Sequence, residues 1–574
     1  MLKIKEILKN EKYFSIIIIL IASIFVCIPL MNKNIDMTYD DGIQHICRII
    51  GTYQSLQEGE TAIMSNFCNG FGYSWNLFYS PLTAYLPLIF KIIGVSFATC
   101  IKLFMFATIF LSGFFMYLFT KKLTKNNNIA ILASILYIFA PYRLTDMYIR
   151  NALAELTSFM FLPLIFLGLY NIFNMEEKGE INKNIYIPLI LGTVGLILTH
   201  TVITMYTAIF ALIYILVNLI KKNTNTDSNK KDILKILLIS ALLILVITSF
   251  FWTPLLELKN SADYEVFKEG RMERTEVLVA YKLDFYRLFF TKSTDYMIYE
   301  IGIVTLLGLI LTPLAIKKIK KEKYYELYLF ALISGIVCCI MTLKIFPFEH
   351  LPSILKMLQF TFRLLEFSSF FFGFVAAINI GVVSKKLERK EIIILLIIIM
   401  LVTIPLSSHL RTIENYDEER LINTVPITEN TGRVHAGCAS FEYLPSKAFE
   451  NRNYIETRTQ NAIVTNGTAQ IENEIKEGSK MSFNLKYVLE ESEIELPYIY
   501  YTGYSVTLEY NGQKVNLKTY ETEKGFVGIK VPILEEGKVE VKYTGTTIMK
   551  ISSFVSVIGV CVLIGMLLPN KKRK

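Results

Sequence analysis

The sequence is dominated by apolar runs long enough to cross a lipid bilayer, separated by polar loops that are mostly short. A helix needs about 20 apolar residues to span the hydrocarbon layer. Twelve candidate spans meet or approach this length, at residues 13–31, 96–119, 129–140, 157–173, 186–198, 202–220, 233–251, 302–316, 325–343, 367–383, 392–406 and 548–568. This pattern predicts a polytopic α-helical membrane protein and excludes a soluble enzyme.

The basic residues predict the orientation of these spans. With twelve spans, every short loop rich in Lys and Arg falls on the same side, including residues 121–125, 221–231, 317–323, 385–390 and 571–574. Cytoplasmic loops of membrane proteins carry an excess of Lys and Arg, so both termini are predicted to be cytoplasmic. The apolar run 81–93 is too short to cross and would break the alternation. It is therefore expected to form a re-entrant or interfacial helix on the outer face.

Composition narrows the function classes. Hydrophobic residues make up 53% of the chain and charged residues 19%, and the net charge is +9. The basic clusters lie between apolar runs, where membrane topology accounts for them, so no nucleic-acid partner is expected. The eight Cys are scattered and predict neither a disulfide framework nor a zinc site. Only Cys47, Cys68 and Cys438 can meet an oxidising compartment. A disulfide between Cys47 and Cys68 remains one alternative.

Three parts of the chain are expected: a transmembrane domain at 1–406, an extracytoplasmic β-rich domain at 407–547, and a final span with a basic tail at 548–574. Residues 506–510 and 514–518 alternate around Asn511-Gly512, a strong hairpin signal. Residues 531–534 are expected to pair with 539–543 across Glu536-Gly537. These strands predict a small β-sandwich before the last helix.

The first outer loop carries residue types used in catalysis. If the chain is helical from Asp41 onward, Asp41, His45 and Arg48 share one face. A carboxylate beside an imidazole and a guanidinium can take a proton from a hydroxyl while a phosphate is held nearby. The alternative is an amphipathic helix that is capped at its N-terminus and has ion pairs along one face.

A second outer stretch, residues 141–155, places Arg143, Asp146 and Arg150 on one helical face, with Glu155 entering the next span. Charges at the edge of a span are costly unless they are paired or functional. Two interpretations remain, an Asp146–Arg150 ion pair that stabilises a short helix and an anion-binding site.

Two further residues are candidates for the same site. His200 lies between two apolar runs at the outer end of a helical hairpin, where it either caps the turn or faces a cavity. Arg363 begins a span three residues before Glu366, as an interfacial anchor or a ligand contact. The sequence contains no phosphate-binding loop, dinucleotide fingerprint, HExxH motif or nucleophile elbow.

Several blocks of the sequence resemble a known family. They are Asp41-Gly42-x-x-His45-x-x-Arg48, residues 70–82, 141–155, 198–200, 359–364, 442–445 and 500–504. These blocks resemble the bacterial membrane proteins called "6-pyruvoyl-tetrahydropterin synthase related", which are relatives of the YfhO-type proteins and of the GT-C class of polytopic glycosyltransferases. Thr361-Phe362 replaces the family's Pro-Trp, and Asp40 replaces its His. The family label names a pterin enzyme, but the sequence has no metal-binding His triad to support that activity.

The GT-C resemblance implies a plasma-membrane enzyme that uses a sugar carried on a polyprenyl phosphate. The acceptor would be a glycan or lipid of the bacterial cell envelope, outside the cytoplasm and in contact with membrane lipids. Asp41 would then be the base, His45 and Arg48 would orient the acceptor and balance charge, and Arg150 and His200 would bind the leaving phosphate. The other substrate-binding residues implied are Asp40, Arg143, Asp146, Glu155 and Arg363.

Some GT-C members hold a divalent cation, and Asp40 with Asp41 is the place for one in this sequence; no other metal site is predicted. Two other functions remain as alternatives. One is a transporter or flippase for lipid or polysaccharide, and the other is a non-catalytic envelope scaffold.

Overall fold

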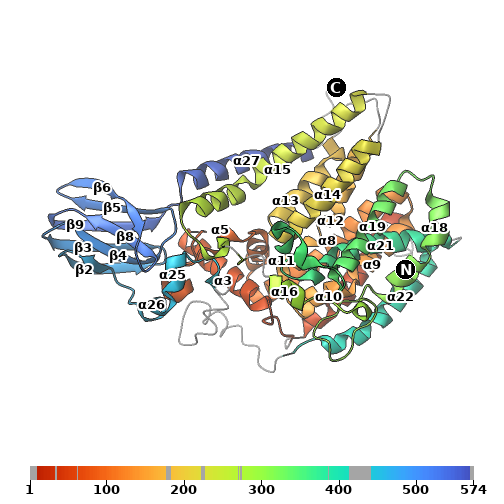
Figure 1. Cartoon of the computed structure of the whole chain (residues 1–574), viewed down its shortest axis with the longest axis horizontal. Helices are drawn as coiled ribbons and strands as arrows, with labels where there is room; N and C mark the ends of the chain where they lie inside the picture. Colours follow the sequence, from red (N-terminus) through yellow and green to blue (C-terminus); the bar gives the residue numbers. More distant parts are fainter. Residues whose placement is uncertain are drawn as a thin grey trace.

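A computed structural model describes residues 10–32, 35–60, 62–175, 183–221, 227–268, 270–271, 275–384, 387–412, 438 and 441–568. A helical body and a β-rich domain lie at opposite ends of its long axis (Figure 1). The helices α15 (Asp227–Ser261) and α27 (Thr547–Leu567) pack side by side and lead from the β-rich domain along the helical body.

Within the described residues, nine helical segments are long and apolar enough to cross a membrane, and ten if the bent pair α9 and α10 counts as one span. The other helices of the body are α2 (Glu11–Cys27), α8 (Phe97–Thr124), α9 (Asn127–Ile138), α10 (Pro141–Tyr148), α11 (Leu153–Ser158), α12 (Leu162–Phe173), α13 (Ile187–Ile197), α14 (Thr201–Lys221), α17 (Ile303–Ile310), α18 (Thr312–Ile319), α19 (Tyr325–Thr342), α21 (Leu364–Val383) and α22 (Arg389–Thr403). The fold is thus a polytopic helical membrane protein.

All twelve predicted spans are helical, but three of them are short or broken. The helix α9 has 12 residues and reaches the length of a span only together with α10, from which it is bent by 43°. The helix α13 has 11 residues and carries Pro188 at its start. The segment 303–319 is divided at Leu311, before Pro313, into α17 and α18 of eight residues each. Proline lacks a backbone N–H and disfavours helical geometry in the residue before it, which explains the break.

Small residues allow the helices of the body to approach closely. A Cβ atom on Gly113 of α8 would lie 2.5 Å from Ile138 of α9, and one on Gly308 of α17 would lie 2.6 Å from the Cβ of Ala376 in α21. Neither site has room for a side chain. Within a membrane, packing of this kind takes over part of the role that hydrophobic burial has in water.

A chain of short helices follows the first span and covers one end of the body. It consists of α3 (Gly42–Glu58), α4 (Phe67–Gly70), α5 (Trp75–Phe78), α6 (Leu82–Tyr85) and α7 (Leu88–Lys91). The helices α6 and α7 occupy the run predicted to be re-entrant or interfacial. Ile89, Ile92 and Ile93 in and after α7 are exposed, which suits contact with lipid.

Short turns complete the helical body and lead into the β-rich domain. They are η1 (Ile28–Met31), η2 (Lys183–Ile185), η3 (Glu265–Phe267), α16 (Thr275–Ala280), η4 (Phe285–Leu288), η5 (Phe348–His350), α20 (Ser353–Lys356), η6 (Thr361–Arg363), η7 (Ile404–His409), α25 (Ser446–Glu450) and α26 (Arg452–Thr457).

The β-rich domain precedes α27, as predicted, and contains two antiparallel sheets. Its strands are β1 (Ile463–Asn466), β2 (Gln470–Glu477), β3 (Lys480–Val488), β4 (Ser492–Ile499), β5 (Tyr504–Tyr510), β6 (Gln513–Leu517), β7 (Thr519–Glu521), β8 (Phe526–Val531) and β9 (Leu534–Tyr543). The sheet orders are β1-β4-β8-β7 and β2-β3-β9-β5-β6. Tyr498 of the first sheet and Tyr504 of the second have ring centroids 5.3 Å apart, in an apolar core that both sheets share.

The two predicted hairpins have different outcomes. The β5–β6 hairpin is confirmed, and Asn511 and Gly512 have the positive φ angles of 49° and 73° that such a turn requires. The second hairpin is wrong, because β9 runs through Gly537, which pairs with Leu485 of β3. The chain turns instead at Pro532, between β8 and β9. Proline has no N–H group with which to continue the hydrogen-bond ladder of β8.

Candidate active site

The N-terminus of α3 directs Asp41 toward the loop between α10 and α11. Asp41 occupies the N-cap position but makes no capping hydrogen bond with its side chain. Its Oδ2 accepts a hydrogen bond from Nη2 of Arg150 at 3.0 Å. The absence of a side chain on Gly42 permits this approach, because a Cβ there would lie 2.7 Å from Asn151. Asp41 therefore stands at the cap position of α3, but its side chain binds Arg150 and does not cap the helix.

Arg150 is the centre of a buried ion network and is only 2% exposed. Its Nη1 donates to Asp146 at 2.9 Å and to Glu155 at 2.7 Å, and its Nε lies 3.9 Å from an oxygen of Asp40. The Asp146–Arg150 pair expected from the spacing is thus present. Since four carboxylates surround this guanidinium, its charge is already compensated within the protein.

A cavity of about 230 Å³ lies beside this network. Its wall brings together six of the residues singled out in the sequence, from four separate segments of the chain. They are Asp41, His45, Arg48, Glu155, His200 and Arg363. Acidic, basic and imidazole groups therefore share one recess, although up to 322 positions separate them in the sequence.

Arg48 faces this cavity without a carboxylate partner. The residue is 1% exposed. Its Nε donates to Asn76 at 3.1 Å and its Nη2 to the carbonyl oxygen of Tyr79 at 2.9 Å. Its Nη1 is buried and has no hydrogen-bond acceptor among the described residues. Burial lowers the pKa of Arg48 to about 10, so the side chain still carries its charge near neutral pH.

The two histidines of the cavity are uncharged near neutral pH. Burial lowers the pKa of His45 to about 4, and the charge of Arg48 acts in the same direction against the raising effect of Asp41. Burial and the charge of Arg363 lower the pKa of His200 to about 3. The Nδ1 of His200 also accepts from the backbone N–H of Ile203 at 3.3 Å. His200 thus both caps its turn and lines the cavity.

Arg363 and Glu155 form the far side of the recess. The Nε of Arg363 donates to Glu155 at 3.1 Å, and its Nη1 donates to the carbonyl oxygen of Leu358 at 3.0 Å. Tyr142 donates to the other oxygen of Glu155. The interfacial-anchor interpretation of Arg363 is wrong, because the residue is buried and points into the protein.

The structure does not bring Arg143 and Asp146 to the cavity wall. Arg143 donates to the carbonyl oxygen of Thr108 at 3.3 Å and to Ser112, within the helical body. The helix α10 ends at Tyr148, so the single helical face expected through Arg150 does not continue that far. Neither Asp40 nor Arg150 lines the cavity. Arg150 binds two residues that do, Asp41 and Glu155, and Asp40 lies next to Arg150.

The sequence interpretation assigned no role to several residues of the wall. Trp75 and Tyr79 come from α5 and its end, and Glu442 and Tyr443 precede the β-rich domain. The ring of Tyr443 stacks on Phe78 with centroids 5.2 Å apart. These residues lie in two of the blocks that resemble the family, 70–82 and 442–445, which is the sequence feature that could have indicated them. No spacing rule, however, links these blocks to Asp41.

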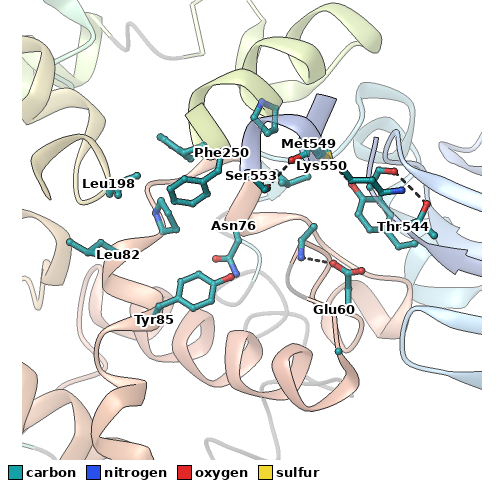
Figure 2. Close-up of a pocket in the computed structure, with 18 residues that line it drawn as sticks. Glu60, Asn76, Leu82, Tyr85, Leu198, Phe250, Thr544, Met549, Lys550 and Ser553 are labelled. Atoms are coloured by element: carbon teal, nitrogen blue, oxygen red, sulfur yellow. Dashed lines mark hydrogen bonds between the residues drawn. The ribbon is translucent and has the colours of Figure 1, made fainter. Parts of the chain in front are cut away.

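A larger hollow of about 850 Å³ adjoins α5, which contributes Asn76 and Leu77 to its lining (Figure 2). Its lining includes Leu82, Leu198, Phe250 and Pro254, with Lys550 of α27 near the β-rich domain. Asn76 lines this hollow while its amide oxygen accepts from Arg48. The helix α5 is thus the partition between a polar cavity and a mainly apolar one.

The residues present do not suit a bound divalent cation. No group of three or more His, Cys, Asp or Glu side chains in the described part of the chain is placed to hold a metal ion. Asp40 and Asp41, the pair considered from the sequence, both face the guanidinium of Arg150.

Comparison with known proteins gives one family and two weak structural likenesses. An uncharacterized protein of Lactococcus lactis subsp. cremoris strain MG1363 is 24% identical over 93% of this chain and 91% of its own length. Two structures of an oligosaccharyltransferase from Archaeoglobus fulgidus share 12% identity with this chain. One is AglB in complex with an inhibitory peptide and a dolichol-phosphate, at a TM-score of 0.44 over 74% of this chain and 60% of that one. The other is the apo form, at 0.43 over 78% and 58%.

The profile of the 6-pyruvoyl-tetrahydropterin synthase related domain, described as a membrane protein, matches residues 77–412, which is more than half of the chain. This match confirms the family that the sequence blocks resembled. The protein therefore belongs to the 6-pyruvoyl-tetrahydropterin synthase related family of membrane proteins.

Proposed function

We propose that this protein is a membrane glycosyltransferase that moves a sugar from a polyprenyl-phosphate donor to a cell-envelope acceptor on the extracytoplasmic side of the plasma membrane. One observation carries the proposal. The buried guanidinium of Arg48 faces a cavity with an unsatisfied N–H group and no carboxylate partner in the described chain, and the carboxylate of Asp41 lies on the same wall.

A buried cation without a counter-charge is energetically costly unless an anion binds to it. A phosphate is a suitable anion, because guanidinium groups bind its oxygens through strong, charge-assisted hydrogen bonds. We assign phosphate binding to Arg48, and a supporting role to Arg363, which lines the same cavity but is paired with Glu155. The role of Arg150 then changes from phosphate ligand to positioning residue, since its charge is compensated by Asp146, Glu155 and the outer-loop aspartates.

In the proposed reaction Asp41 takes the proton from the acceptor hydroxyl. The acceptor oxygen forms a bond to the anomeric carbon while the bond from that carbon to the phosphate oxygen breaks. The bonding electrons leave with the phosphate, whose growing negative charge is stabilised by Arg48 and Arg363. Groups that bind this developing charge more strongly than the starting ester accelerate the step.

The larger hollow supports a lipid-linked substrate. A polyprenyl chain is apolar and needs an apolar channel next to the site that holds its phosphate. The hollow offers Leu82, Leu198 and Phe250, and only α5 separates it from Arg48. In this proposal the chain lies in the hollow while its phosphate reaches past α5 into the cavity.

The test uses the full chain in lipid vesicles with a panel of polyprenyl-phosphate sugars and candidate acceptors, and mass spectrometry of the products. We expect a glycosylated acceptor from wild-type protein and none from Asp41→Asn. Donor binding without product, unchanged by Asp41→Asn, would indicate a scaffold. Movement of the donor across the bilayer without sugar transfer would indicate a flippase.

A further inference from the structure

Two buried cysteines from distant parts of the chain face each other. The Sγ of Cys68, in α4, lies 3.3 Å from the Sγ of Cys438, 370 residues later. Each residue is 1% exposed. Cys68 thus meets Cys438, not Cys47, the partner that the sequence had left open.

Hydrogen bonds hold the two segments together on both sides of the sulfur pair. The hydroxyl of Tyr73 donates to the carbonyl oxygen of Cys438 at 2.7 Å and accepts from the backbone N–H of Tyr443 at 3.0 Å. The side-chain amide of Asn69 donates to the carbonyl oxygen of Ile455 at 3.1 Å. The approach of the two sulfur atoms is therefore a consequence of how the first outer loop docks on the segment before the β-rich domain.

We propose that Cys68 and Cys438 form a disulfide that joins the first outer loop to the segment leading into the β-rich domain. A disulfide has an S–S length of about 2.05 Å, so closing the bond shortens the present separation by about 1.3 Å. Side-chain rotation and small backbone shifts supply a movement of this size.

The reaction balances with an oxidised thiol–disulfide exchange protein as the oxidant. Each cysteine loses one proton, one S–S bond forms, and two electrons pass to the partner's disulfide, which opens and takes up two protons as two thiols. Burial raises the pKa of the Cys68 thiol well above its usual value. The reactive thiolate is therefore scarce in the folded protein, and the exchange belongs to the folding stage, before burial.

The bond would stabilise the wall of the proposed active site. Glu442 and Tyr443 line the cavity only a few residues after Cys438. A crosslink across 370 positions removes conformational freedom from the unfolded chain. The inference rests on the extracytoplasmic placement of this face, where disulfides persist, but not on sugar transfer.

The first experiment reads the bond directly. Full-length protein is isolated from membranes of cells whose outer compartment is oxidising, with free thiols blocked by N-ethylmaleimide before lysis, and is digested without reduction. Mass spectrometry is expected to find a Cys68–Cys438 crosslinked peptide that disappears on reduction and in Cys68→Ser. The control Cys47→Ser, in the same outer loop, should keep it. Wild-type protein with both Cys68 and Cys438 alkylated would overturn the proposal.

The second experiment measures the contribution of the bond to stability in the wild-type protein. Reduction of purified wild-type protein is expected to lower its Tm by several degrees, and the same reductant should leave Cys68→Ser/Cys438→Ser unchanged. An unchanged wild-type Tm after verified reduction would overturn the stabilising role. Protein that transfers sugar but has both thiols alkylated would contradict the disulfide and leave the proposed function standing. Protein that contains the crosslink but transfers no sugar would support the disulfide and contradict the proposed function.

Discussion

The Oδ2 atom of Asp41 lies 3.0 Å from Nη2 of Arg150, although 109 residues separate them. Arg150 is bound on its other side by Asp146 and Glu155. This contact joins the N-terminus of α3 to the loop between α10 and α11 and sets the carboxylate of Asp41 at the cavity wall. The site therefore depends on a buried ion network that positions its proposed base.

Asp41→Asn is expected to lower turnover about a hundred- to ten-thousand-fold, the usual range for loss of a general base. The amide oxygen of Asn can still accept from Arg150, so the fold and the Tm should change little. Turnover with reconstituted protein, together with the Tm, measures both effects. Retained turnover would remove Asp41 as the base.

Arg48→Met and Arg150→Met are expected to separate ligand binding from stability. Removing Arg150 leaves Asp146 buried without its cation and leaves Glu155 with Arg363 as its remaining cation, which should lower the free energy of unfolding by about 3–5 kcal/mol. Removing Arg48 leaves no carboxylate without its cation. It removes two hydrogen bonds, which contribute about 1 kcal/mol each to the free energy of unfolding. Arg48→Met should nevertheless bind a polyprenyl phosphate at least tenfold more weakly. Chemical unfolding and a lipid-binding assay check the pair, and equal losses of stability would contradict the assignment.

Asp40 is expected to give a pH dependence of stability. Burial and the nearby charge of Asp41 raise its pKa from 3.8 to about 6, against the lowering effect of Arg150. Between these two values the folded chain keeps a proton that the unfolded chain has released. The free energy of unfolding should therefore fall as the pH rises from about 4 to about 6 and then level off.

The difference in Tm between wild type and Asp40→Asn isolates this contribution, because other titrating groups cancel. Wild type should lose stability relative to the variant as the pH rises through 6. A difference that stays constant across this range would contradict the raised pKa.

Gly42→Ala is expected to disturb the site without touching any charged group. The added Cβ would lie 2.2 Å from the carbonyl oxygen of Met37, and a backbone atom cannot move aside cheaply. We expect a loss of about 1–3 kcal/mol in the free energy of unfolding and lower turnover, since Asp41 is displaced. Gly565→Ala in α27 is the matched control, because its Cβ meets no atom within 4 Å. A neutral Gly42→Ala would show that the loop can shift freely.

Filling the larger hollow is expected to discriminate between donors by chain length. Ser553→Trp places a large ring in the hollow, whereas Val557, one turn further along α27, does not line the hollow, so Val557→Trp is the control. Ser553→Trp should raise KM for long polyprenyl donors at least tenfold and affect short-chain analogues little. Equal kinetics for both chain lengths would place the lipid elsewhere.

The membrane architecture was predictable from the sequence because each part of the signal is local. A long apolar run reports its own helix. The β5–β6 hairpin was predictable for the same reason, since Asn511 and Gly512 determine the turn between their own strands. The Gly537 turn was wrong because pairing with Leu485 of β3 holds Gly537 inside β9.

The candidate site was predictable as residue types but not as an arrangement. Asp41, His45, Arg48, Glu155, His200 and Arg363 stood out individually, and only packing of the outer loops against the helical body puts them around one cavity. The different environments of Arg150 and Arg48 depend on long-range contacts, which local spacing does not encode. The sequence by itself thus determined that this is a polytopic helical membrane protein, identified its family and singled out the candidate residues. Tertiary structure decided which arginine is compensated, because the energy of a buried charge depends on the groups that surround it in space.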